Sequence, residues 1–85
     1  MTEQEILDRL SKIFFREFEI EPEKITPAAT VYEDLELDSL DSIDLIVALE
    51  NEFGMKVDRE KDEQTIRAIR TIADVIGYIQ AKLGQ

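Results

Sequence analysis

The sequence predicts an all-α fold: a small antiparallel four-helix bundle with a long loop between the first and second helices. Apolar residues recur at helical spacing in several segments, and no segment shows the alternation typical of a strand. The chain has 85 residues, 44% hydrophobic and 35% charged, which is the composition of one soluble domain with a modest core. We expect residues 1–85 to form a single domain with three longer helices and a shorter third one.

The first helix is expected over residues 3–18. Apolar residues recur there at intervals of three and four, and charged residues occupy most of the other positions, so one face can pack against a core. The expected core face consists of Ile6, Leu10, Ile13 and Phe14, with Leu7 and Phe18 at its margins.

A long loop is expected from Glu19 to Asp38, because the helical period is lost and Pro22 and Pro27 interrupt the backbone pattern. Connections of this length are unusual in a small domain and are commonly functional or fixed by their own side chains. We expect four apolar side chains to fix this loop to the core: Ile25, Val31, Leu35 and Leu37.

The second helix should begin at Asp38 or Ser39, since either side-chain oxygen can accept hydrogen bonds from the free N–H groups of a first turn. It should continue to Phe53 and end at Gly54. The carboxylates of Asp38 and Asp41 also suit the positive end of the helix dipole.

The remaining two helices differ in the strength of their signals. Residues 58–69 are highly charged and contain only two isoleucines, so they predict a third helix with ill-defined ends. Thr71 and Asp74 form a T-x-x-D capping pattern that opens a fourth helix over residues 72–83. Its expected core stripe is Ile72, Val75, Ile76, Ile79 and Leu83.

The second helix has apolar residues on two faces. Leu45, Ile46, Leu49 and Phe53 lie together on the face expected to enter the core. Leu40, Ile43 and Val47 lie roughly opposite, and a small bundle cannot easily bury both sides of one helix. For Ile43, cover by the loop or the third helix is an equal alternative; Leu40 and Val47 are expected to face a partner.

Charge and composition exclude several functions. The chain has 20 acidic and 10 basic residues and a net charge of -10, which disfavours nucleic acid and anionic lipid and favours basic protein surfaces. It has no Cys and no His, so the usual zinc ligands and the usual general base are missing. No stretch is long and apolar enough for a membrane span or a secretory leader, and a cytoplasmic location is expected.

The stretch D-S-L-D-S-I-D-L, Asp38 to Leu45, places a serine where the loop gives way to the second helix. Ser39 can act simply as a helix cap. It does not suit nucleophilic catalysis, because the chain lacks a histidine base and a G-x-S-x-G turn. A serine exposed at a helix start can instead be the substrate of another enzyme and receive a phosphate-containing group.

The segment E-D-L-E-L-D-S-L-D-S-I-D-L-I-V-A-L-E-N-E-F-G, residues 33–54, resembles the signature region of acyl carrier proteins, and a looser resemblance covers the whole chain. In that family the serine of D-S-L receives the 4'-phosphopantetheine arm of coenzyme A from a phosphopantetheinyl transferase. The resemblance implies that Ser39 is that attachment residue and that Ser42 is not modified. It also implies a carrier that is not itself an enzyme. We expect a monomer without a dedicated metal site, although low-affinity binding of divalent ions stays an alternative.

The resemblance further implies partners and cargo. Carriers of this family dock on basic patches of synthases, reductases, acyltransferases and ligases in fatty acid, polyketide or related lipid biosynthesis. The matching docking residues here are Asp38, Leu40, Asp41, Asp44 and Val47. Acyl chains in such carriers can fold back between the helices, so a second set of residues could line a cavity or simply form core: Leu45, Leu49, Ile69 and Ile76.

Two departures and two alternatives accompany the resemblance. Glu36 stands where family members often have glycine, and the segment after Phe53 is about one helical turn longer than usual, which predicts a longer, tilted third helix. Both favour a specialised carrier over one for bulk fatty acid synthesis. The alternatives are an aminoacyl or peptidyl carrier, and an acidic helical adaptor without a prosthetic group. Calcium binding is disfavoured because D-S-L-D-S-I-D-L lacks the glycine and terminal glutamate of an EF-hand loop.

Overall fold

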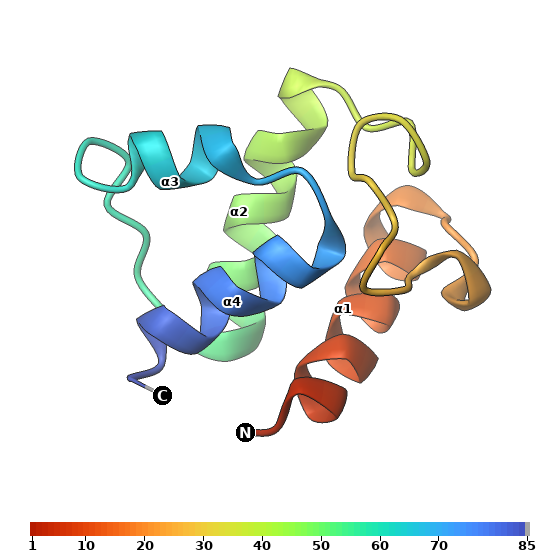
Figure 1. The fold of residues 1–85 in the computed structure, drawn as a ribbon, viewed down its shortest axis with the longest axis horizontal. Helices are drawn as coiled ribbons and strands as arrows, with labels where there is room; N and C mark the ends of the chain where they lie inside the picture. The colour runs from red at the N-terminus through yellow and green to blue at the C-terminus, as the bar shows by residue number, and fades with distance from the viewer. Residues whose placement is uncertain (85) are drawn as a thin grey trace.

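The computed structural model describes residues 1–84 of the protein, and of Ser39 it describes the backbone alone. Within this part the chain forms helices α1 (Glu3–Phe18), α2 (Ser39–Phe53), α3 (Glu63–Ala68) and α4 (Ile72–Lys82) (Figure 1). A 3-10 turn, η1 (Pro22–Lys24), lies within the long loop. No strand occurs among the described residues, and α1 and α2 run in opposite directions, so the predicted all-α bundle is confirmed.

Helix α1 begins and ends with defined caps. The Thr2 hydroxyl accepts a hydrogen bond from the Glu5 N–H at 3.1 Å, and the Glu5 carboxylate accepts one from the Thr2 N–H at the same distance. This reciprocal pair satisfies two donors that a helix start otherwise leaves open. At the other end Glu19 adopts a left-handed conformation, and its N–H donates to the carbonyl of Phe15. The bounds match the predicted residues 3–18.

The core lies where α1 packs against α2 and α4. The predicted face of α1 is fully buried, and the α4 stripe from Ile72 to Ile79 is buried as well. Leu7, Phe18 and Leu83 pack against this core from its edge. Burial of apolar side chains is the main stabilising term of such a bundle.

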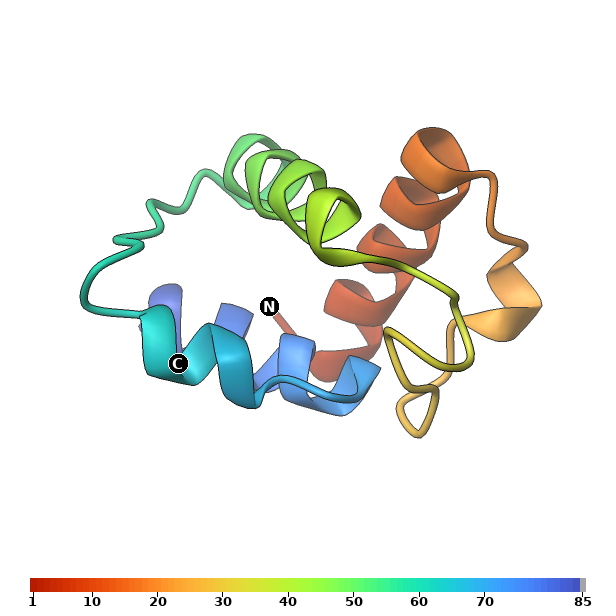
Figure 2. The same ribbon diagram turned by 90° about the horizontal axis from the view of Figure 1, so that it is seen from above.

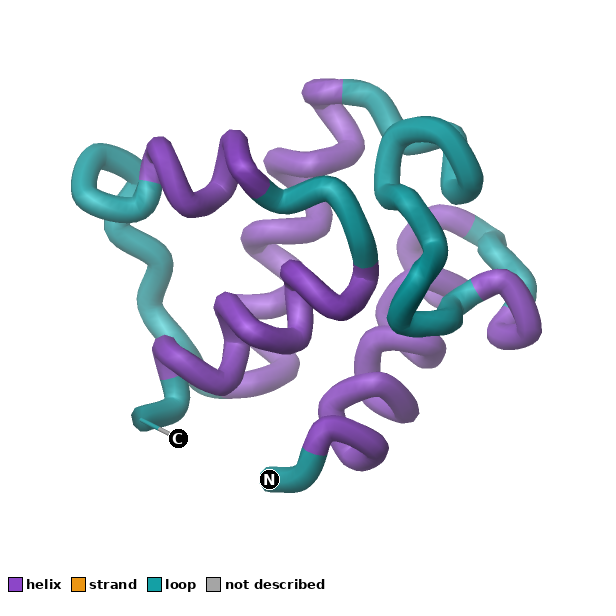
Figure 3. The backbone as a smooth tube through the Cα atoms, viewed as in Figure 1, coloured by secondary structure: helices purple, strands orange, loops and turns teal. Residues whose placement is uncertain are grey.

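The long loop folds back over the bundle and is fixed to it (Figure 3). All four predicted anchoring residues, Ile25, Val31, Leu35 and Leu37, are buried. Backbone hydrogen bonds join the loop to the start of α4: the Val31 N–H donates to the Arg70 carbonyl at 2.8 Å, and the Ile72 N–H donates to the Ala29 carbonyl at 2.9 Å. Figure 2 shows this loop running from the end of α1 past α4 to the start of α2.

Among the described residues the third helix is the shortest of the four, as predicted, but its expected lengthening over the charged segment is wrong. Helix α3 has six residues. Residues 58–62, which were expected to begin the helix, form a non-helical turn before it. The Asp58 carboxylate accepts hydrogen bonds from the N–H groups of Glu60 and Lys61, both at 3.1 Å. An aspartate that bonds to nearby backbone N–H groups stabilises a turn in competition with a helix. The charged segment therefore forms part of the connection between α2 and α3 and not the first turn of α3.

Glu36 has a φ of 56°, in the left-handed region that favours glycine. We expect Glu36→Gly to raise the free energy of unfolding by about 1 kcal/mol or less, because relief of about 1–2 kcal/mol of backbone strain exceeds a glycine entropy cost of about 0.5–1 kcal/mol. Urea unfolding measures this difference. Glu33, whose φ is not positive, is the control, and Glu33→Gly should destabilise the fold. A lower stability of Glu36→Gly would contradict the strain argument.

Candidate functional site

The start of α2 is fixed by Asp38 and Asp41. One carboxylate oxygen of Asp38 accepts hydrogen bonds from the N–H groups of Leu40 and Asp41, both at 2.9 Å. The Asp41 carboxylate accepts a hydrogen bond from the Asp38 N–H at 3.1 Å. Asp38 is therefore the cap, which decides between the two residues that the sequence left open.

Ser39 is the first residue of α2, directly after the cap. Its side chain lies outside the described part of the structure, so its predicted role as the attachment residue stays a prediction. Its neighbours are well placed for access, because Asp38 and Leu40 are both exposed. The backbone at this position is held by the capping pair on either side of it.

The second apolar group of α2 is exposed. The exposed fraction is 71% for Leu40, 46% for Ile43 and 44% for Val47. Neither the long loop nor α3 covers Ile43 fully, so this alternative for Ile43 is wrong. Exposure agrees with the expected docking surface, but docking itself stays a prediction.

The three carboxylates predicted on the docking surface differ in their surroundings. Asp38 and Asp44 are exposed, whereas Asp41 is half-buried. Asp38 and Asp41 also hold the first turn of α2 through the hydrogen bonds described above. Asp44 lies beyond the cap and is the best choice for a test of charge alone.

The opposite side of α2 borders a small apolar cavity beneath α3. Leu45, Leu49 and Ile69 line it, as predicted, together with Ser42 and Tyr78. Ile76 does not; it lines a separate groove between α1 and α4. The cavity volume is about 40 Å³, close to the space of one water molecule. An acyl chain cannot enter it without movement of a wall.

A polar groove near the start of α2 was not predicted. It lies between the end of α1 and residues 34–37 and has a volume of about 580 Å³. Its acidic lining includes Glu19, Asp34, Glu36 and Asp41. Hydrogen bonds from the Thr30 N–H and hydroxyl lower the pKa of Asp34, which keeps this carboxylate charged. The acidic run E-D-L-E-L-D was the signal for it in the sequence.

The described residues contain no group of three or more His, Cys, Asp or Glu side chains that could hold a metal ion. Among the helices of residues 1–84, none is both long and apolar enough to cross a membrane.

Comparisons with known proteins identify the class of carrier. Residues 8–79 match the family described as "Phosphopantetheine attachment site". Two curated relatives are Acyl carrier protein 2 of Ralstonia nicotianae, 41% identical, and the acyl carrier protein of Thermosynechococcus vestitus, 40% identical; in each case the match covers 98% of both chains. A solved structure of the acyl carrier protein from Enterococcus faecalis has a TM-score of 0.68 and 29% identity, over 96% of this chain and 99% of that one.

The fold and the family match define a domain that bears a phosphopantetheine group. The chain belongs to the acyl carrier protein family. Proteins of this family carry acyl intermediates on phosphopantetheine and are carriers rather than catalysts, as the resemblance implied. They interact with the transferase that loads them and with acyl-handling enzymes.

Proposed function

We propose that Ser39 is the attachment residue and that this protein presents acyl groups to enzymes of fatty acid, polyketide or related lipid biosynthesis. The observation that supports Ser39 most is its position as the first residue of α2, next to exposed Asp38 and Leu40. The group bound there supplies a terminal thiol that holds the acyl group as a thioester, which this cysteine-free chain does not itself provide. A monomeric, cytoplasmic carrier fits this role.

The residues around Ser39 fit a group that extends into solvent. Helix starts often bind phosphate through their free N–H groups. Here the Asp38 carboxylate already occupies the N–H groups of Leu40 and Asp41. These donors are not available to a phosphate, so the covalent bond to Ser39 holds the group. The capping pair fixes the backbone of the first turn that bears the attachment point.

The exposed face of α2 is the proposed docking surface, formed by Asp38, Leu40, Asp41, Asp44 and Val47. The exposed fraction of its apolar side chains supports this assignment, and we add Ile43 because it is exposed beside them. Negative charge steers a basic partner toward this face, and apolar contact then holds the complex. The net charge of -10 is consistent with such partners.

Loading of the unmodified protein tests the proposed function. Apo protein is incubated with coenzyme A, Mg²⁺ and a broad-specificity phosphopantetheinyl transferase, and its intact mass is then measured. We expect a gain of one arm per chain. An acidic adaptor without a prosthetic group would gain no mass, and this outcome would reject the carrier function.

Charge reversal at Asp44 tests the docking surface. We expect Asp44→Lys to slow loading about tenfold at low salt and less at high salt, since steering by exposed charges is screened by ions. The initial rate of mass gain measures the effect, and circular dichroism checks that the helices persist. Asp41 is less suitable, because its carboxylate also caps α2.

Glu60→Lys is the matched control, because it makes the same change in net charge on an exposed residue of the turn before α3. It should leave the loading rate close to that of the unmodified sequence. Equal slowing by both variants would show that total charge, and not the α2 face, determines the rate.

A further inference from the structure

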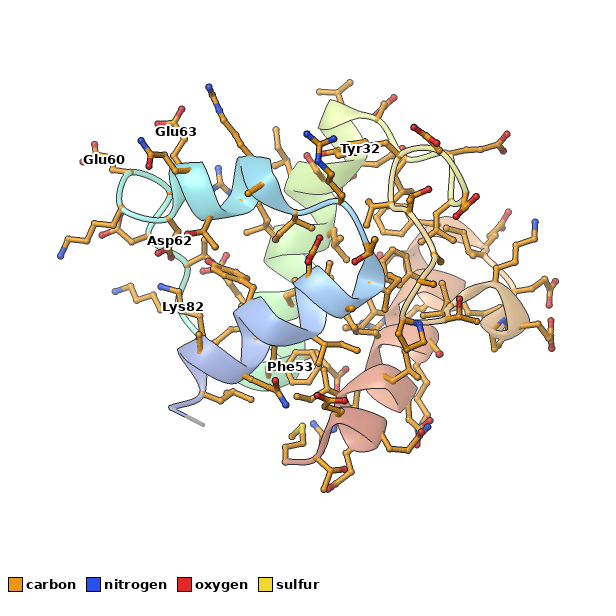
Figure 4. All side chains as sticks on the ribbon, in the orientation of Figure 1. Tyr32, Phe53, Glu60, Asp62, Glu63 and Lys82 are labelled. Atoms are coloured by element: carbon orange, nitrogen blue, oxygen red, sulfur yellow. The ribbon has the colours of Figure 1, made fainter. Side chains whose placement is uncertain are left out.

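A cluster of three side chains joins the start of α3 to the end of α4. The Tyr78 hydroxyl donates a hydrogen bond to a carboxylate oxygen of Asp62 at 2.9 Å. The Lys82 ammonium forms an ion pair with the same oxygen and lies 5.9 Å from the centre of the Tyr78 ring. Figure 4 labels Asp62 and Lys82, which face each other between the turn before α3 and the last turn of α4.

Asp62 occupies the cap position of α3 but does not cap it. Its side chain makes no capping hydrogen bond to α3; the carboxylate instead bonds to Tyr78 and Lys82 of α4 and accepts a hydrogen bond from the Asp58 N–H at 3.3 Å. A cap contributes appreciably to a short helix, so this orientation weakens α3 on its own. The contact with α4 replaces the cap and makes the position of α3 dependent on α4.

Helix α3 is otherwise loosely attached. None of its residues, Glu63 to Ala68, is fully buried. Its apolar contact comes from Ile66, together with Ile69 just after it, and both are only partly buried. These two residues form one wall of the apolar cavity, and its other walls come from α2, α4 and the long loop, which contributes Val31 and Tyr32. Segments with little buried apolar surface open at a low free-energy cost.

Tyr78 is part of both the apolar cavity and the cluster with Asp62 and Lys82. Its ring lines the apolar cavity, and its hydroxyl bonds to Asp62. The hydrogen bond from Lys82 lowers the pKa of Asp62. The pKa of Tyr78 is raised, mainly by burial and to a lesser extent by its hydrogen bond to Asp62. At neutral pH the tyrosine therefore remains a donor and the aspartate an acceptor.

We propose that Asp62, Tyr78 and Lys82 form a latch that holds α3 closed over the apolar cavity, and that release of this latch controls when the space between α2, α3 and α4, where carriers of this family can enclose an acyl chain, becomes open. That the enclosed chain is the acyl group carried by this protein rests on the proposed function. The latch itself does not, since all its atoms belong to the polypeptide. Its strength sets how readily the carrier encloses its cargo.

Hydrogen exchange on the unmodified apo protein and two variants tests the latch. Tyr78→Phe removes the hydroxyl and keeps the ring, and Asp62→Asn removes the charge and keeps the shape. We expect the amides of Ile66 and Ile69 to exchange about tenfold faster in both, because Tyr78→Phe loses the hydrogen bond to the carboxylate and Asp62→Asn replaces the charged acceptor by a neutral one. The amides of α1 are the internal reference and should change much less.

Glu63→Gln is the matched control. It breaks an ion pair with Arg67 on the exposed side of the same helix and leaves Asp62 in place. Its α3 amides should exchange as in the unmodified protein. The latch is rejected if α3 exchange in Tyr78→Phe and Asp62→Asn equals that of this control, or if α1 and α3 accelerate equally.

Binding of Nile red, an uncharged apolar dye, tests access to the cavity in the same apo proteins. We expect severalfold higher dye fluorescence for Tyr78→Phe and Asp62→Asn than for Glu63→Gln. Faster exchange of α3 without extra dye binding would overturn the assignment of the cavity as the site that opens. Because no variant alters Ser39 and no arm is present, these outcomes are independent of whether the loading assay succeeds.

Discussion

Ser39→Ala is expected to abolish loading by a phosphopantetheinyl transferase. The unmodified apo protein should gain the mass of one arm, and the variant should gain none, because alanine has no oxygen to attack the phosphate of coenzyme A. The fold should remain intact, since the cap of α2 is formed by Asp38 and not by Ser39. Intact mass spectrometry and circular dichroism measure the two results.

Ser42→Ala is the matched control for this result. Ser42 lies one turn further along α2, where its N–H donates to the Asp38 carbonyl at 3.1 Å and its side chain borders the apolar cavity. Its side chain is half-buried. Ser42→Ala should therefore load like the unmodified protein. If Ser42→Ala lost loading and Ser39→Ala did not, the attachment residue would be Ser42 and the assignment to Ser39 would be wrong.

Phe14→Ala is expected to destabilise the fold by about 3–5 kcal/mol, the usual cost of replacing a buried phenylalanine by alanine. Phe14 is completely buried on α1 and lies in the core shared with α2 and α4. In a domain of this size such a loss is a large part of the total stability. Urea unfolding followed by circular dichroism measures the change.

Phe15 provides the control, because it is the next residue of the same helix and has an exposed fraction of 53%. Phe15→Ala should change the free energy of unfolding by about 0.5 kcal/mol or less, as surface substitutions usually do. Similar losses for the two variants would show that helix formation, and not core burial, limits stability.

The elements with strong local signals were predicted well. The predicted caps at Asp38 and Thr71 bond within a few residues, and the apolar stripes of α1 and α4 repeat at helical spacing, so both features can be read from short segments. The four loop anchors were also predicted, because a loop of this length in a small domain needs apolar contacts. That residues 1–85 form a single domain stays a prediction.

The errors arose where contacts between distant segments decide the structure. The third helix was predicted too long because the Asp58 side chain stabilises a turn, and a charged sequence suits both turn and helix. Of the residues expected to line a cavity or form core, Ile76 is a core residue: it is buried and borders the groove beside α1. The bond between Asp62 and Tyr78 spans 16 positions and has no local signal.

The candidate site was predicted in outline from D-S-L and the second apolar face of α2. Sequence alone could not separate the carboxylates, since Asp41 and Asp44 differ only in what they contact: Asp41 bonds to the Asp38 N–H, and Asp44 lies on the open helix surface. It also could not show that Glu36 adopts a left-handed backbone, which explains why glycine suits that position.

The most direct test of the account is the location of the arm in protein purified from its native cell. Tandem mass spectrometry of a peptide containing residues 38–44 can place the added mass between the fragment ions that separate Ser39 from Ser42. The account predicts that the mass of one 4'-phosphopantetheine lies on Ser39. Its presence on any other residue, or its absence from protein that a competent transferase also fails to load, would contradict the account.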